Sequence, residues 1–268
     1  MQVPERVRRL LEPIGCLAKA QGVRAYAVGG CVRDWLLGYV DAMDVDIAVE
    51  GDGIAFARQL AQALEGSIQV HPAFGTSTVL IPRDKLPLSL ASTRRDSQRP
   101  TRSHRAVPQQ LSGPFRMDVA TCRRETYAKP AAYPKVTPGM LKDDLFRRDF
   151  TINAMAIALT PRAFGRLIDP FHGANDLRWK RLRILHARSF LDDPSRILRG
   201  IRFAHRFGLC WERKTEQAMR EALAAGALEW LNAGRLRKER QRMAHEPSPE
   251  ACLQDLEALW PPMANGRR

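Results

Sequence analysis

Two stretches decide the fold of this 268-residue chain: YAVGGCVRD at residues 26–34 and DVDIAV at residues 44–49. In order, they predict a short apolar strand, a glycine turn, a helix and a second strand. Gly29 and Gly30 permit backbone angles that other residues avoid, and they let the backbone approach a ligand closely. The helix predicted after them points its N-terminal amides and the positive end of its dipole at the turn, which suits a phosphate group.

Asp44 and Asp46 make the second strand a candidate metal site. Residues two apart on a strand point to the same side, about 6.6 Å apart along it. Carboxylates beside a phosphate-binding turn can hold a divalent metal on a nucleoside triphosphate. Each feature alone is more often an ordinary turn or a solvated strand end. Their closeness in the sequence favours a catalytic site.

The combined pattern, including Arg33 and Asp34, resembles the first signature of the tRNA nucleotidyltransferase and bacterial poly(A) polymerase family. This family is the class II branch of the polymerase-beta-like nucleotidyltransferases. The resemblance implies an α/β head with a small mixed sheet, followed by an all-helical neck. Rossmann and P-loop fingerprints are absent, which argues against a dinucleotide enzyme or a P-loop NTPase.

The chain is strongly basic, with 43 Lys and Arg against 29 Asp and Glu and a net charge of +14. Such a balance favours a polyanionic partner such as RNA, although genomic composition can also produce it. The five cysteines form no Cys-x-x-Cys pair, so we expect neither a zinc site nor a disulfide framework. A cytoplasmic location is expected for the same reason. We expect no membrane span and no signal peptide.

We expect two domains: a nucleotidyltransferase head at residues 1–170 and a helical neck at residues 171–268. Residues 83–116 carry eight Lys and Arg against two Asp, with four prolines, and predict a mobile insertion. This insertion either grips RNA phosphates or is a solvated loop without a role. Residues 123–141 predict a second loop, and Pro13 is expected to kink or divide an N-terminal helix.

A second signature of the same family is matched by residues 147–154, RRDFTINA. Guanidinium groups match phosphate oxygens, and we expect Arg148 to bind a phosphate. Asp149 and Asn153 lie four residues apart, which predicts that they share one helical face. The resemblance implies that both lie near the ribose of a bound nucleotide. A capped amphipathic helix with a salt bridge is the alternative.

A further signature is matched at Asp193 and Arg196, within residues 192–204. A carboxylate accepts from the exocyclic amine of cytosine or adenine, while an arginine donates to the neighbouring ring nitrogen. The same pair rejects uracil and guanine, and the resemblance assigns this selection to these two residues. Arg33 and Arg199 are further nucleotide-binding candidates. The alternative is a plain helix cap followed by a basic stripe.

Two other positions bear on the site. Asp118, on a strand expected beside the Asp44 and Asp46 strand, is a candidate third catalytic carboxylate, acting as general base or metal ligand. A plain strand aspartate is the alternative. A fifth signature of the family is degraded, because Gly234 stands where relatives carry glutamate.

The resemblance implies an enzyme that adds CMP, AMP or both to tRNA 3′ ends, taking them from CTP and ATP without a template. Two Mg²⁺ ions would assist the transfer. A poly(A) polymerase acting on general RNA and a non-catalytic RNA-binding remnant are the alternatives. The resemblance covers about residues 26–259, and relatives continue into body and tail domains, so we expect these to be missing here. The sequence does not indicate the oligomeric state.

Overall fold

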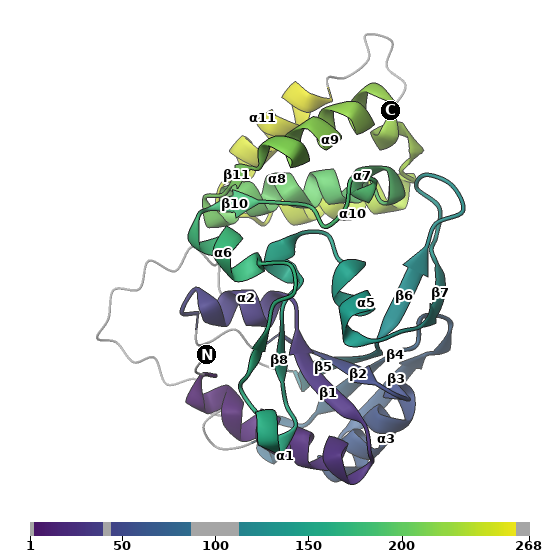
Figure 1. Cartoon of the computed structure of the whole chain (residues 1–268), viewed down its shortest axis with the longest axis vertical. Coiled ribbons are helices and arrows are strands. Elements are labelled where there is room, and N and C mark those ends of the chain that lie inside the picture. Colours follow the sequence, from purple (N-terminus) through teal and green to yellow (C-terminus); the bar gives the residue numbers. More distant parts are fainter. Residues whose placement is uncertain (1–2, 40–43, 87–112, 261–268) are drawn as a thin grey trace.

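The computed structural model describes residues 3–39, 44–86 and 113–260, and a mixed seven-stranded sheet forms its lower half in Figure 1. The strands lie in the order β3 (Ser67–His71), β4 (Thr76–Ile81), β5 (Phe115–Thr121), β2 (Val45–Glu50), β1 (Arg24–Val28), β8 (Ala156–Ala158) and β9 (Leu167–Ile168). All neighbours pair antiparallel except β2 and β5, which are parallel. The predicted α/β fold with a mixed sheet is confirmed.

Strand β2 has two chemically different faces because side chains alternate along a strand. Val45, Ile47 and Val49 are buried in the main core beneath the sheet. Asp46 lies on the opposite face, which is also the face of Ala48. The alternation therefore buries the apolar side chains of β2 and leaves its carboxylate on the face that carries the site.

Two helices, α1 (Glu5–Ala20) and α3 (Gly53–Ala63), contribute to the main core of the sheet. Helix α1 is a single helix with Pro13 inside it, so Pro13 does not divide the helix, while a kink at Pro13 stays a prediction. Leu11 and Ile14 flank Pro13 and are fully buried. Their burial holds the helix together although proline removes one backbone hydrogen bond.

The opposite face of the sheet packs against α5 (Leu141–Phe146), through Leu141 and Leu145. Residues 123–138, expected to be a loop, form an antiparallel hairpin of β6 (Arg123–Thr126) and β7 (Lys135–Pro138). The loop prediction is therefore wrong for the two strands, whereas residues 127–134 between them form a loop. Three prolines in this region hid the alternation of the strands, but Pro138 stands at the last ladder position, where a missing N–H costs little.

Helices form the upper half of the molecule in Figure 1. They are α6 (Gly173–Arg178), α7 (Ser189–Asp192), α8 (Ser195–Phe207), α9 (Arg213–Ala224), α10 (Ala233–Met243) and α11 (Pro249–Leu259), with a two-stranded pair of β10 (Arg181–Leu182) and β11 (Cys210–Trp211). Their core includes Phe150 and Ile152, which lie between α5 and β8 in the sequence. The helical part after the sheet is as predicted, whereas a domain boundary at residue 170 stays a prediction.

No α-helix joins Asp149 and Asn153, although their spacing predicted one shared helical face. Helix α5 ends at Phe146, residues Thr151–Asn153 form one 3₁₀ turn, and β8 follows. Helix α2 (Gly30–Leu36) lies where it was predicted, directly after the glycine turn. Burial of Phe150 and Ile152 in the helical core turns the chain between the two halves of the molecule.

The basic insertion connects β4 and β5, which are hydrogen-bonded neighbours in the sheet. Residues 87–112 of it lie outside the described part of the chain. Arg83–Lys85 form a 3₁₀ turn, and Arg116 belongs to β5 rather than to the insertion. None of the described helices is long and apolar enough to cross a membrane.

Candidate active site

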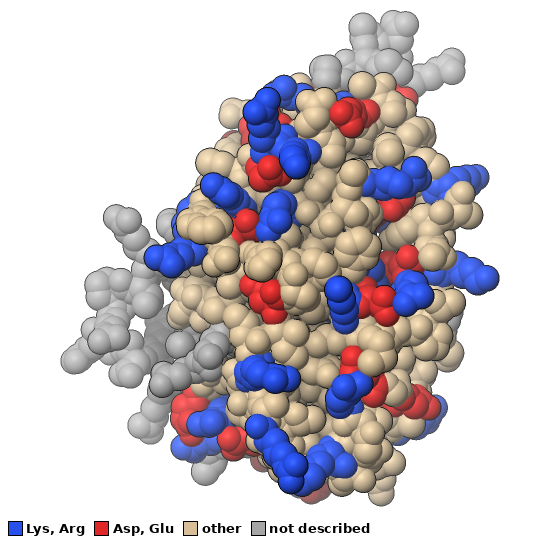
Figure 2. Space-filling model, in the orientation of Figure 1, with Lys and Arg blue, Asp and Glu red and all other residues tan. Residues whose placement is uncertain are grey.

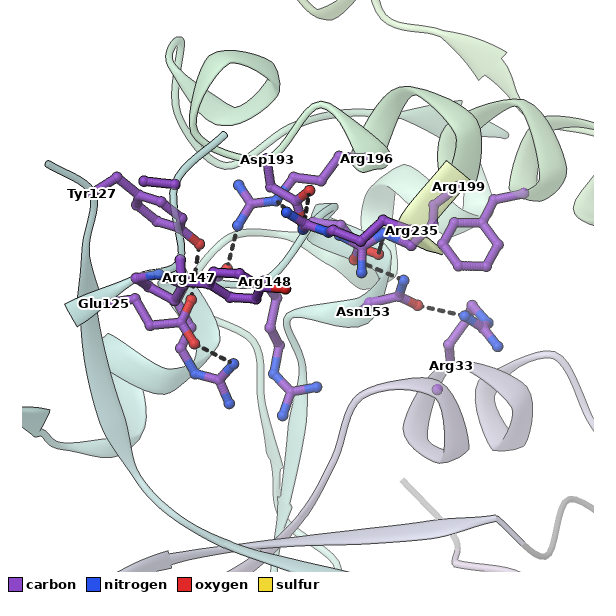
Figure 3. Close-up of a pocket in the computed structure, with 16 residues that line it drawn as sticks. Arg33, Glu125, Tyr127, Arg147, Arg148, Asn153, Asp193, Arg196, Arg199 and Arg235 are labelled. Carbon is purple, nitrogen blue, oxygen red and sulfur yellow. Dashed lines mark hydrogen bonds and ion pairs between the residues drawn. The ribbon is translucent and has the colours of Figure 1, made fainter. Parts of the chain in front are cut away.

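A polar cavity of about 480 Å³ lies between α2, the segment after α5, the β6–β7 hairpin and the helices α8 and α10. Eight of the residues predicted from the sequence line it: Gly30, Arg33, Arg148, Asp149, Asn153, Asp193, Arg196 and Arg199. In Figure 3, Arg33 reaches the cavity from α2, while Asp193 and Arg199 reach it from the region of α8. Sequence motifs more than 100 residues apart thus meet in one place.

The glycine turn packs directly against an arginine. Gly29 has a φ of 81°, and its backbone N–H donates to Met155 at 3.1 Å. A Cβ at this position would overlap the guanidinium of Arg148. Burial lowers the pKa of Arg148, but Asp144 and Asp46 outweigh it and raise that pKa, so the arginine stays charged. A permanent positive charge therefore sits at the turn predicted to hold phosphate.

Asp149 and Asn153 lie together although no helix joins them. The side-chain amide N–H of Asn153 donates to Asp149 Oδ1 at 2.9 Å, and Arg33 Nη1 donates to Asn153 Oδ1. Arg33 also pairs with Asp34, and its guanidinium lies 4.4 Å from the ring centroid of Phe207. Through these contacts Arg33 orients Asn153. A direct contact between Arg33 and a nucleotide stays a prediction.

Asp193 stands before α8 with its two carboxylate oxygens in different surroundings. Oδ1 accepts from Ser195 N at 3.1 Å, Ser195 Oγ at 2.6 Å and Arg235 Nη2 at 2.7 Å, while Oδ2 accepts from Arg199 Nη2 at 3.0 Å. Burial raises the pKa of Asp193, but Arg199, Ser195 and Arg235 outweigh it and lower that pKa. Asp193 is therefore ionised, and Oδ2 keeps acceptor capacity for a ligand.

Arg196 supplies the neighbouring donor. Its Nη1 donates to Ser189 Oγ at 2.6 Å and its Nη2 to the Arg147 carbonyl oxygen at 2.7 Å. Its Nε is buried, finds no hydrogen-bond partner among the described residues, and lies 4.0 Å from Asp193 Oδ2. The side chain is only 3% exposed, so the alternative of a solvated basic stripe does not describe Arg196.

Asp46 and Asp118 line a second cleft, of about 210 Å³, on the face of the sheet that also packs against α5. Asp46 and Asp118 are directly opposite each other on the parallel strands β2 and β5, so both point to this face. Asp44 stands one residue before β2 and is exposed. Partial desolvation and the charges of Asp118 and Asp44 raise the pKa of Asp46 to about 6, against the lowering effect of Arg148.

The donor chemistry of this cleft fits Mg²⁺, which prefers carboxylate oxygens. Asp46 and Asp118 bring two carboxylates to one end of this cleft. Within the described ranges, however, no group of three or more His, Cys, Asp or Glu side chains is gathered as a metal site. Asp118 is instead paired with Arg116. The assignment of Asp44 and Asp46 as metal ligands stays a prediction.

Comparison with known proteins now places the chain. Residues 25–183 match the model of the Poly A polymerase head domain, which is more than half of the sequence. The chain belongs to the poly(A) polymerase head-domain family. This family is the one that the glycine turn and the strand carboxylates predicted.

Relatives of this chain within the family are named tRNA nucleotidyltransferases. An A-adding tRNA nucleotidyltransferase of Halalkalibacterium halodurans is 37% identical over 94% of this chain and 52% of its own length. Another of that name from Aquifex aeolicus is 42% identical over 81% of this chain and 22% of its own length. The solved structure of an apo CCA-adding enzyme matches with a TM-score of 0.79 and 35% identity, over 95% of this chain and 53% of that one. The chain thus spans about half the length of the first relative.

In this member of the poly(A) polymerase head-domain family, the cavity is also lined by residues that were not predicted as site residues. Arg235 of α10 lines the cavity and contacts Asp193, and its signal was the Arg-x-x-x-Glu remnant of the degraded signature. Glu125 accepts from Tyr127 at 2.9 Å and from Arg147 at 3.2 Å, as Figure 3 shows. The strand alternation of Glu125 and Tyr127 was the signal for this second group, and the prolines nearby concealed it.

Proposed function

We propose that this chain transfers a nucleotide, AMP foremost, from a nucleoside triphosphate to the 3′ end of a tRNA. The observation that carries this proposal is one cavity in which Asp193 and Arg196 lie across from the Gly29 turn and Arg148. Asp193 and Arg196 suit a base, whereas the Gly29 turn and Arg148 suit phosphates. On the face in Figure 2, basic side chains are interspersed with acidic ones, whereas the cavity gathers six arginines.

Base selection follows from one donor and one acceptor in the cavity that can still form hydrogen bonds. Asp193 Oδ2 can accept from the exocyclic amine of adenine or cytosine, and Arg196 Nε can donate to the adjacent ring nitrogen. Uracil and guanine present a carbonyl and a ring N–H at these places, which leaves both protein groups unsatisfied. An unsatisfied buried polar group costs about 1–3 kcal/mol. We therefore assign the choice of ATP and CTP to this pair.

The other half of the reaction belongs to the sheet. Arg148 at the glycine turn holds the triphosphate, and Asp149 with Asn153 positions the ribose. Asp44 and Asp46 would hold Mg²⁺, which supplies charge neutralisation at the phosphate and a more reactive 3′-hydroxyl. Asp118, opposite Asp46 in the sheet, serves as general base or as a further ligand. A cytoplasmic location agrees with tRNA as the substrate.

AMP is placed first because two relatives that match most of this chain are named A-adding enzymes. CMP addition and the complete CCA sequence use the same base edge, since cytosine also offers an amine beside an unprotonated ring nitrogen. A poly(A) polymerase acting on general RNA is the second candidate, and the family description favours it. These activities differ in what they add and in when they stop.

The test incubates the protein and Mg²⁺ with tRNAs ending before C74, before C75 or before A76, each with one labelled nucleoside triphosphate. A single AMP added to the tRNA that ends in CC supports the proposal. Addition of CMP extends the assignment to C residues, whereas a long A tail on any RNA would favour poly(A) polymerase. The Asp46→Asn variant controls for a contaminating enzyme.

Magnesium-dependent nucleotide binding separates these enzymes from a non-catalytic RNA-binding protein. A binding module needs neither the strand carboxylates nor the base-reading pair. Arg148 and Asp193 line one cavity, and Arg148 lies close enough to Asp46 for its charge to lower the pKa of that carboxyl, which favours the enzyme. Absence of binding of ATP and CTP in the presence of Mg²⁺, with RNA binding intact, would reject the enzymatic proposal.

A further inference from the structure

One catalytic candidate, Asp118, is fully engaged by other side chains. Arg116 Nη2 lies 3.1 Å from Asp118 Oδ1 and 3.0 Å from Oδ2, and Arg116 Nε lies 3.2 Å from Oδ1. Thr78 Oγ1 donates to Oδ1 at 2.6 Å. Both carboxylate oxygens of Asp118 therefore have donors that face them. A cation that needs Asp118 must compete with the arginine.

The position of Arg116 follows from the strand pattern. Arg116 and Asp118 are two residues apart on β5, so both project from the same face. The parallel register pairs Val45 with Met117 and Asp46 with Asp118, so Arg116 comes one residue before the first paired position of β5 and Asp44 one residue before that of β2. The guanidinium thus stands at the edge of the three carboxylates that the sequence nominated as catalytic.

This ion pair is open to water. The Arg116 side chain is 66% exposed and that of Asp118 is 43% exposed. Exposed ion pairs contribute little net stability because water and salt screen them. A divalent cation between carboxylates carries twice the charge and binds oxygen directly. A divalent cation that binds Asp118 can therefore displace the guanidinium at little cost.

Arg116 also lines the sheet cleft, together with Asp46, Asp118, Thr76, Thr78 and His71. This cleft extends from the carboxylates toward β3, the edge strand of the sheet. Arg116 is thus an exposed guanidinium in the same cleft as the carboxylates, where it can meet a phosphate of an RNA 3′ end. Arginine is well suited to phosphate because its donors form a planar fork.

We propose that Arg116 is the built-in counter-ion of Asp118, and that a divalent cation displaces its guanidinium from Asp118 to the phosphates of the RNA strand. The first half concerns this chain and the cation alone. The second half rests on the proposed function, because it needs an RNA 3′ end. Arg116 is then a positioning residue: it keeps Asp118 paired before the cation enters and holds the RNA afterwards.

The first experiment measures Mn²⁺ binding to the full chain by electron paramagnetic resonance, without nucleotide or RNA. Arg116→Gln removes the competing charge, so we expect about threefold to tenfold tighter Mn²⁺ binding, in line with the small worth of an exposed pair. Arg116→Lys keeps the charge and should bind Mn²⁺ within about twofold of the wild type. Equal or weaker Mn²⁺ binding by Arg116→Gln would overturn the counter-ion role.

The matched control is Arg124→Gln. Arg124 makes a comparable pair with Asp143, with Nη2 at 3.1 and 3.2 Å from the two oxygens and 62% of the arginine side chain exposed. Arg124 does not line the cleft of the strand carboxylates. We expect its loss to leave Mn²⁺ affinity unchanged. An equal gain in Arg116→Gln and Arg124→Gln would mean that only net charge was measured, and would also reject the proposal.

The second experiment measures the affinity for tRNA ending in CC, with Ca²⁺ and without a divalent cation. We expect Arg116→Gln to weaken RNA binding about threefold or more with Ca²⁺ and to have little effect without it. An equal loss in both conditions would contradict displacement by the cation. If no variant binds RNA, the proposed function fails, while the Mn²⁺ result still decides the counter-ion role.

Discussion

Arg235 Nη2 donates to Asp193 Oδ1 at 2.7 Å, across 42 residues of sequence. This contact joins the start of α10 to the turn that begins α8. Oδ1 also accepts from Ser195, so its acceptor capacity is used up. Arg199 holds the other oxygen. The carboxylate that we assign to base selection is thus fixed from two helices at once.

Loss of Arg235 should impair nucleotide selection without removing a base contact. Arg235→Gln takes away a charged donor, and hydrogen bonds to charged groups contribute about 1.5–3 kcal/mol. We expect kcat/KM for ATP to fall roughly tenfold to hundredfold and the preference over GTP to narrow. Steady-state incorporation with each nucleotide measures this effect. The exposed Arg220, paired with Glu216 on α9, gives the control variant Arg220→Gln, which should behave as wild type.

The glycine turn should tolerate no side chain because of Arg148. Gly29→Ala combines a strained φ with an overlap on the guanidinium, so we expect a loss of about 1–3 kcal/mol in stability and loss of nucleotide binding. Gly208 also has a positive φ, but nothing lies within 4 Å of its added Cβ. Gly208→Ala should lose a similar stability, about 1–2 kcal/mol, yet keep nucleotide binding. Equal nucleotide binding by both variants would show that Arg148 does not need this space.

The degraded signature predicts a stabilising change. Gly234 lies in the first turn of α10, and an added Cβ would meet Asn232 Oδ1 only at an ordinary contact of 3.4 Å. Gly234→Ala should raise the free energy of unfolding by about 0.5 kcal/mol, because alanine loses less backbone entropy in a helix. Thermal unfolding measures it. Gly200→Ala is the contrast: it would overlap Trp211 and should lower the melting temperature clearly.

Stability should depend on acid pH through Asp193. Its pKa is lowered in the folded protein, so its stabilising contribution is present above the unfolded value of about 3.9 and is lost as pH falls toward the folded pKa. The difference in unfolding free energy between wild type and Asp193→Asn should therefore be largest near neutral pH and shrink below pH of about 4. Urea unfolding between neutral pH and pH of about 3 measures it, and a gap that widens in acid would contradict this assignment.

Much of the site was readable from the sequence because each motif is local. The glycine turn, Asp46, Arg148 and Asp193 each stand in a short pattern whose strand, turn or helix start has its own signal. The structure then brings their motifs together at one cavity and one cleft. The alternation of apolar and acidic residues in 44–49 was enough to predict a strand with Asp46 on it.

The remainder depended on contacts between distant segments. Arg235 could not be placed beside Asp193 before the packing of α10 on α8 was known. Asp149 and Asn153 were expected on a helix, but burial of Phe150 in the helical core turned the chain there instead. The pairing of Asp118 with Arg116 needed the strand boundaries, because Arg116 had been counted as part of the insertion.

The most direct test of the central claim is the equilibrium binding of ATP, CTP, GTP and UTP to the wild type and to Asp193→Ala, with Mg²⁺ and without RNA. We predict that the wild type binds ATP or CTP at least about tenfold more tightly than GTP and UTP, since one unsatisfied buried pair costs on the order of 1–3 kcal/mol. We expect this preference to disappear in Asp193→Ala. Equal affinity of the wild type for all four triphosphates would contradict it.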